Sequence, residues 1–130
     1  MSDGKGRVEL IERFPGFFRA TEEGFGLSDL GIWTGPGWDG VIGQCLTTLA
    51  GLGLPDDFRL VQIKEKFGEL RIYHNGRTGE HDHAVEDAIA QATEASVHTC
   101  ERCGMAGIRM AEHGWWRTLC ASCLQRSSEA

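Results

Sequence analysis

The chain lacks long apolar runs: none approaches the ~18 residues that a membrane-spanning helix needs. Residues 1–7 are polar and lead into no apolar secretory segment. These absences predict a cytoplasmic protein with no membrane association, in a compartment where thiols stay reduced. The 130 residues, 41% of them hydrophobic, suffice for one domain, or for one domain with a small additional segment that a metal ion stabilises.

Positive charge is also scarce. The chain has 13 lysines and arginines against 19 aspartates and glutamates, a formal net charge of −6. Proteins that bind long stretches of duplex through its phosphates are usually basic, so the negative net charge argues against duplex binding. Residues 80–97 hold five acids and no lysine or arginine, whereas residues 98–126 hold four arginines and two acids. We interpret the acidic stretch as a solvated helix face, with a surface for a basic partner as the alternative.

Three segments are predicted to be helical. The first spans residues 7–14 and is stopped by a Pro-Gly pair. The second spans residues 38–49, where apolar residues recur at i, i+3, i+4, i+7, i+8 and i+11. Cys45 lies on this stripe and is interpreted as a small buried hydrophobe, with a catalytic thiol as the alternative. The third helix begins with Asp82 as its N-cap and runs to about Val97.

A β-hairpin is predicted between the second and third helices. Residues 59–65 alternate, with Val61 and Ile63 on one face, and the return strand follows a turn at residues 66–68. The opposite face of the hairpin carries Gln62, Lys64, Arg71 and Tyr73. An isolated hairpin is marginal in water, so one face must pack on the helices. The glycine-rich residues 24–37 are expected to form a loop.

Four cysteines have the spacing of a metal site. They form two Cys-x2-Cys pairs separated by 16 residues: Cys100 with Cys103, and Cys120 with Cys123. Two such knuckles make a closed tetrahedron of thiolates with no position left for water or substrate. Residues 108–110 and 115–119 are predicted as the strands of a zinc ribbon, so we expect one structural Zn²⁺. Two disulfides or Cys-x2-Cys redox chemistry are the rival interpretations, and a reduced compartment and the paired motif disfavour them.

The ribbon also carries two adjacent tryptophans. On a strand, Trp115 and Trp116 point to opposite faces, so we expect one ring to pack inward and the other to be exposed. With Arg109 and Arg117 nearby, an exposed ring could stack on a base or fill a partner's pocket. Packing between the two parts of the chain is the alternative interpretation.

Three histidines, His74, His81 and His83, raise the hypothesis of a second metal site. They fall in a loop and at a helix start, where histidine is commonly a solvated polar residue, so we do not expect a second metal.

Two motifs together suggest a family. The segment KEKFGELRIY at residues 64–73 is followed by Cys-x2-Cys-Gly and by GWWRTLC at residues 114–120. This combination resembles a group of small uncharacterised bacterial and phage proteins, over the part of the chain from Trp38 onward. Ile72 stands where an aromatic residue is common in that group, which is a departure. The resemblance implies a shared fold and a phage or prophage origin, and it implies no reaction.

The expected fold is α+β. Residues 1–98 form two N-terminal helices, a β-hairpin and a third helix, and residues 99–130 form a zinc ribbon packed on them. We expect a non-enzymatic protein that binds a protein partner, in the manner of a phage accessory protein that inhibits or redirects a host complex such as a defence system. The expected contact residues are Lys64, Arg71, Tyr73, Arg109, Trp116 and Arg117.

The alternative is a nucleic-acid-binding ribbon. Its track would consist of Arg102, Arg109, Trp116 and Arg117, extended by Lys64, Lys66 and Arg71. A small hydrolase that uses the three histidines is the least favoured hypothesis.

Overall fold

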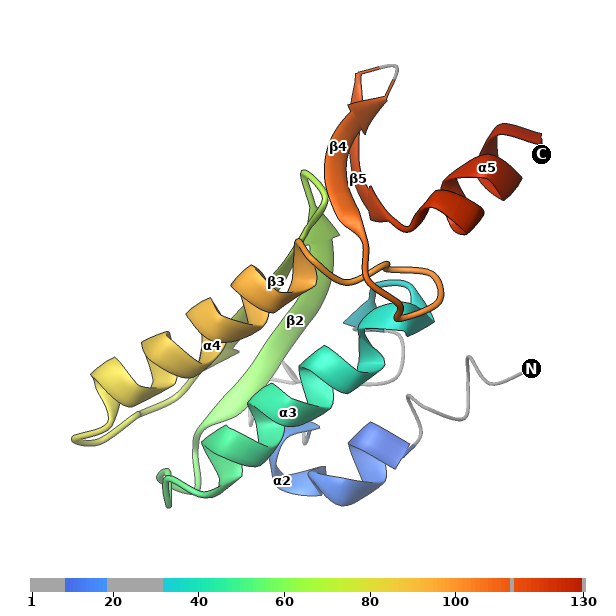
Figure 1. Cartoon of the computed structure of the whole chain (residues 1–130). Coiled ribbons are helices and arrows are strands. Elements are labelled where there is room, and N and C mark those ends of the chain that lie inside the picture. The colour runs from blue at the N-terminus through green and yellow to red at the C-terminus, as the bar shows by residue number, and fades with distance from the viewer. Residues whose placement is uncertain (1–8, 19–31, 113, 130) are drawn as a thin grey trace.

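The computed structural model describes residues 9–18, 32–112 and 114–129. A helical stretch at residues 9–13 leads into α2 (Pro15–Phe18). The further elements in chain order are β1 (Ile32–Trp33), the 3₁₀ helix η2 (Pro36–Trp38), α3 (Asp39–Ala50), β2 (Arg59–Lys66), β3 (Glu69–Asn75), α4 (Asp82–Ser96), β4 (Ile108–Glu112), β5 (Trp115–Leu119) and α5 (Ala121–Glu129), as Figure 1 shows.

One three-stranded sheet, in the order β1-β2-β3, organises the larger part of the molecule. β1 runs parallel to β2, and β2 runs antiparallel to β3. Helices α3 and α4 lie side by side across one face of this sheet (Figure 1). The core between them holds side chains with no exposed surface, among them Trp38, Leu46, Leu60, Ile63 and Leu70. β4 and β5 form a separate two-stranded sheet, so the α+β prediction is confirmed.

The apolar stripe of the second helix is confirmed. Ile42, Cys45, Leu46 and Leu49 are buried on α3, and Trp38 closes the 3₁₀ turn that precedes it. Burial raises the pKa of the Cys45 thiol to about 11, so Cys45 is a protonated core residue at neutral pH. Among the described residues, no helix combines the length and apolarity that crossing a bilayer requires.

The first segment differs in detail from the prediction. Helical residues 9–13 match it, while residues 7 and 8 lie outside the described part. Phe14 interrupts the helix, and Pro15 then opens the short α2, because proline is well tolerated in the first turn of a helix.

Strand β1 lies in the segment that was expected to be a loop. Residues 24–31 fall outside the described part, but Ile32 and Trp33 pair with Ile63 and Lys64 of β2. Ile32 is buried at 3% exposure beside the core strand. A strand of two residues has no detectable alternation, so only the partner strand identifies it.

The hairpin is present, with one irregularity. A register shift between Leu60 and Gln62 interrupts the expected alternation, so that Leu60 is fully buried and Val61 only half-buried. The turn consists of Phe67 and Gly68, both at positive φ (56° and 80°), as a two-residue turn between twisted strands requires.

The N-cap of helix α4 lies one residue before the predicted one. His81 is the N-cap and Asp82 the first helical residue, and no side-chain hydrogen bond caps this end. Ser96, at the last turn, is fully buried, and its Oγ accepts a hydrogen bond of 3.0 Å from the Leu70 backbone N–H, which offsets the cost of burying the hydroxyl. This contact ties the end of α4 to β3.

Candidate metal centre

The four ribbon cysteines converge on one point. Their Sγ atoms all lie within 4.8 Å of one another, and the sulfurs of Cys103 and Cys120 are 3.7 Å apart. A tetrahedral cation with metal–sulfur bonds of about 2.3 Å places its sulfurs about 3.8 Å apart. A disulfide would require about 2.05 Å, and all five cysteines of the chain are free. The cluster can therefore hold one metal ion.

Each knuckle directs hydrogen-bond donors at its own sulfurs. The backbone N–H of Cys103 points at Cys100 Sγ (3.5 Å), and that of Cys123 points at Cys120 Sγ (3.4 Å). The guanidinium of Arg126 donates to Cys123 Sγ at 3.0 Å. These donors stabilise negative charge on sulfur and so favour the thiolate, which is the form that binds a metal.

The pKa values of the cysteine thiols depend on these hydrogen bonds, on burial and on the neighbouring sulfurs. Burial raises the pKa of the Cys100 thiol, but the surrounding backbone N–H groups outweigh burial and bring it down to about 6. For Cys103 the N–H of Met105 lowers the pKa, but desolvation and the three neighbouring sulfurs raise it to about 11. Four thiolates at this spacing repel one another, so full ionisation of the cluster needs a cation at its centre.

The ribbon is anchored to the sheet through the tip of the β2–β3 hairpin. The Thr118 hydroxyl donates to the Gly68 carbonyl at 2.6 Å, and Arg109 Nε donates to the Phe67 carbonyl at 2.8 Å. Thr118 is fully buried in this contact. Thr118 lies on β5 and Arg109 lies opposite it on β4, so both strands of the ribbon take part.

A second anchor joins the first knuckle to the start of α3. The backbone N–H of Gly37 donates to the Glu101 carbonyl at 2.7 Å, and the indole N–H of the buried Trp38 donates to the Thr99 carbonyl at 2.8 Å. A Cβ atom on Gly37 would lie 2.1 Å from the Cys100 carbonyl oxygen. The close approach therefore requires glycine, and it connects the metal knuckle to the core.

The expected contact residues fall into two groups. Lys64, Arg71 and Tyr73 lie on the sheet face that α3 and α4 leave uncovered, where Lys64 stands opposite Arg71 and its ammonium is 5.6 Å from the Tyr73 ring centre. Arg109 and Trp116 lie on the ribbon face that meets the hairpin tip, and the guanidinium stacks 4.2 Å over the Trp116 ring.

The other face of the ribbon was only partly anticipated. Arg117 lies there, as do Trp115, which is 75% exposed, and Ile108, which is 66% exposed. Trp116, the ring chosen from the sequence, is 41% exposed. The sequence could have identified this face. Residues alternate between the two faces along the two predicted strands, and Ile108 and Trp115 fall on the face opposite Thr118.

The three histidines do not assemble with other ligands. In the part of the chain that the structure describes, the four cysteines are the one group of three or more His, Cys, Asp or Glu side chains that could hold a metal. His74 instead stacks on Phe58 with ring centres 5.2 Å apart.

None of the protein-family models, curated proteins or solved structures compared with the chain matches it. The chain is thus characterised by its α+β fold and by four converging cysteines that could hold one metal ion.

Proposed function

We propose that this chain is a small non-enzymatic zinc-ribbon protein that acts through contacts with another protein. Zinc is favoured because four thiolates in a closed tetrahedron are a common structural zinc site. The knuckle hydrogen bonds and the 3.7 Å sulfur separation fit that geometry. Native mass spectrometry and elemental analysis of the reduced protein should find one zinc per chain. Stoichiometric iron would contradict this assignment, because iron also accepts four thiolates.

The observation that carries the binding proposal is the outer face of the ribbon, formed by Ile108, Trp115 and Arg117. Two large apolar side chains there are among the most exposed of the described residues. The opposite face is already used to contact the hairpin tip. Tryptophan and arginine are enriched among the residues that dominate the binding energy of protein interfaces.

Charge supports a protein partner over a nucleic acid. Four thiolates around one Zn²⁺ carry a net charge of −2. Residues 98–126 have four arginines and two acids, an excess of two positive charges that this dianion offsets. Arg126 is directly engaged with a cysteine sulfur. The ribbon therefore has little net positive charge to attract phosphates.

The test is affinity purification of the tagged protein from its native host, with and without nuclease. We expect a protein partner that survives nuclease and is lost on Trp115→Ala, with a smaller loss on Trp116→Ala. Trp33→Ala is the matched control, since Trp33 is 66% exposed on β1 and belongs to neither ribbon face. The resemblance leads us to propose a host complex, such as a defence system, as the partner.

Nuclease-sensitive recovery would contradict the proposal. So would tight, salt-sensitive binding of oligonucleotides that is lost when Arg109 and Arg117 are changed to Ala. Either result would favour a nucleic-acid-binding ribbon.

A further inference from the structure

The cysteine cluster has one buried edge and one edge that faces solvent. Cys100 and Cys123 have no exposed surface, and they pack against the buried Leu119. Cys103 is exposed, and Cys120 is half-buried. A small solute can therefore reach two of the four sulfurs from water, and these two belong to different Cys-x2-Cys pairs.

The two solvent-facing sulfurs are also close neighbours. The Sγ atoms of Cys103 and Cys120 lie 3.7 Å apart. A disulfide between them requires the sulfurs to approach by about 1.7 Å, to a bond length of about 2.05 Å. An exposed thiolate with a second cysteine beside it is the arrangement found in redox-sensing proteins.

Arg126 strengthens the difference between the two edges. Its guanidinium donates a hydrogen bond of 3.0 Å to the buried Cys123 Sγ. A charge-assisted hydrogen bond withdraws electron density from a thiolate and so makes that sulfur a poorer nucleophile. Cys123 is therefore both shielded from solvent and made less reactive, so oxidation should begin at the solvent-facing edge.

We propose that Cys103 and Cys120 form a site of oxidative modification, at which a hydroperoxide releases the metal and thereby ends partner binding. The Cys103 thiolate attacks one oxygen of hydrogen peroxide, the O–O bond breaks, and a sulfenic acid and hydroxide form. The Cys120 thiolate then attacks the sulfenic sulfur, and a second hydroxide leaves. Each hydroxide takes a proton from solvent. Two thiolates thus lose two electrons to give one disulfide, while one peroxide and two protons become two water molecules.

The release of metal follows from the number of ligands that remain. After oxidation only the thiolates of Cys100 and Cys123 are left, and two ligands hold zinc far more weakly than four. Because metal binding supplies the folding energy of the ribbon, its loss unfolds the outer face of Ile108, Trp115 and Arg117. This inference rests on the proposed zinc site and binding face. It differs from exchange within one Cys-x2-Cys pair, because the new bond joins the two pairs.

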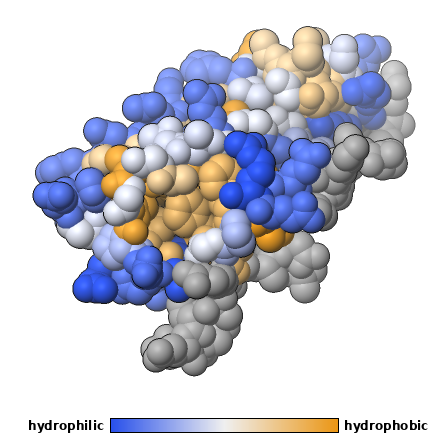
Figure 2. Space-filling view, turned by 90° about the horizontal axis from the view of Figure 1, so that it is seen from below, coloured by the Kyte–Doolittle hydropathy of each residue, from blue (hydrophilic) through white to orange (hydrophobic). Residues whose placement is uncertain are grey.

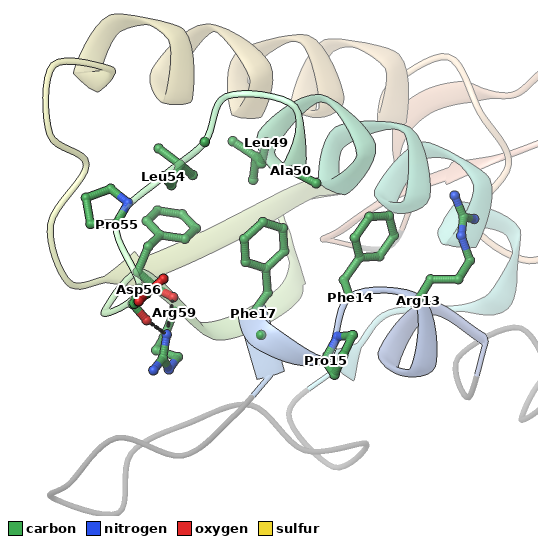
Figure 3. A pocket seen from close by; sticks show the side chains of 13 residues that line it. Arg13, Phe14, Pro15, Phe17, Leu49, Ala50, Leu54, Pro55, Asp56 and Arg59 are labelled. Carbon is green, nitrogen blue, oxygen red and sulfur yellow. Dashed lines mark hydrogen bonds between the residues drawn. The ribbon is translucent and has the colours of Figure 1, made fainter.

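The larger part of the molecule should keep its structure during this change. The ring centres of Phe14 and of Phe17 on α2 are 6.0 Å apart (Figure 3), and Phe17 meets Phe58 at 5.5 Å. Figure 2 shows hydrophobic surface gathered on this side of the molecule, bordered by hydrophilic side chains. The hollow beside these rings is lined by none of the four cluster cysteines. The NMR signals of the three rings therefore report whether unfolding is confined to the ribbon.

The test is a titration of the zinc-loaded full chain with hydrogen peroxide. Zinc content is measured first, and zinc release is then followed with a chromophoric chelator. We expect one zinc released for each disulfide formed, unchanged phenylalanine signals, and zinc binding restored by dithiothreitol. In the affinity purification, the partner should be lost after peroxide and recovered after reduction.

The disulfide is located by mass spectrometry of unreduced peptides after the free thiols are blocked. Trypsin cleaves after Arg102 and so separates Cys100 from Cys103, while fragment spectra distinguish Cys120 from Cys123. Met105 is an internal reference for reactivity, because its thioether is 68% exposed and also reacts with peroxide. The cluster should be oxidised while most of this methionine is still intact.

One variant removes the reactive thiolate and keeps a metal site. Cys103→His leaves three cysteines and one histidine, which also bind zinc. It should release zinc at least about tenfold more slowly in peroxide. Cys45→Ala is the matched control, since Cys45 is buried outside the cluster, and it should release zinc at the wild-type rate. If Cys103→His binds no zinc, the wild-type disulfide map decides.

A first disulfide within either Cys-x2-Cys pair would overturn the proposal, as would oxidation of Met105 before zinc release. Partner binding that persists after zinc has left would also overturn it. The zinc and disulfide measurements need no partner, so failure to recover one would contradict the proposed function alone. A chain found without zinc before peroxide is added would contradict both.

Discussion

Replacing Gly37 with alanine probes how strongly the metal centre is coupled to the core. The added Cβ would lie 2.1 Å from the Cys100 carbonyl oxygen and 2.6 Å from the Glu101 carbonyl carbon. Both atoms are backbone atoms of the first knuckle, so no side-chain rotation relieves the overlap. The knuckle must therefore move away from the start of α3.

The cost of this movement follows from the contacts that would break. The knuckle is held by Gly37 N–H to the Glu101 carbonyl at 2.7 Å, by Gly35 N–H to the Glu101 carboxylate at 2.8 Å, and by the Trp38 indole to the Thr99 carbonyl at 2.8 Å. Three hydrogen bonds at about 1 kcal/mol each give a loss of about 3 kcal/mol. Since the metal-free ribbon is expected to be unfolded, this energy is realised only when metal binds. Gly37→Ala should therefore weaken zinc affinity by roughly 150-fold.

The assay is competition for zinc against a chromophoric chelator, together with urea unfolding of the zinc-loaded protein. Gly40→Ala is the matched control, because Gly40 is exposed on α3, three residues after Gly37, and a Cβ there meets nothing within 4 Å. That control should keep zinc affinity and gain about 0.5–1 kcal/mol of stability through helix propensity. If Gly37→Ala loses stability but keeps wild-type zinc affinity, the knuckle is docked without metal and the coupling argument is refuted.

Three further outcomes are expected. Cys103→Ser should lower zinc affinity and unfold the ribbon, while the three-stranded sheet persists. Zinc competition and circular dichroism would measure these effects, and a folded, zinc-free ribbon would contradict the metal assignment. The Cys45 thiol, buried and with its pKa raised to about 11, should react with thiol reagents only on unfolding, and fast labelling of the native state would reopen the catalytic-thiol hypothesis. Thr118→Val should cost about 1–3 kcal/mol in urea unfolding by leaving the Gly68 carbonyl without its donor, and an unchanged midpoint would show that the hairpin tip does not hold the ribbon.

Local patterns were sufficient for much of this protein. The two Cys-x2-Cys pairs identified the cysteine cluster, because a knuckle is built from hydrogen bonds within four residues. The apolar spacing of residues 38–49 identified the buried face of α3, because helical periodicity is a local property. The paired strands around Phe67 and Gly68 were likewise evident from their alternation.

The helix after the second knuckle was not predicted. Residues 121–129 form α5, yet their apolar residues, Ala121, Cys123 and Leu124, all lie near its start and make too short a stripe to indicate a helix. Its first turn contains Cys123, so the knuckle geometry itself begins this helix. Apolar periodicity alone does not detect a helix that starts in this way.

What the tertiary structure decided depends on residues far apart in the chain. The contact between Gly35 and Glu101 joins positions 66 residues apart, and the Thr118 bond to Gly68 spans 50 residues. The ring contact between Phe17 of α2 and Phe58, with centres 5.5 Å apart, likewise joins distant parts of the chain. The sequence by itself determined the helices α3 and α4, the β2–β3 hairpin and the four cysteines that could hold a metal, because those choices rest on hydrogen bonds and periodicity within a few residues. The sequence did not determine which tryptophan is exposed or what anchors the ribbon. Both depend on how the finished elements pack, because side chains from distant segments meet at those surfaces.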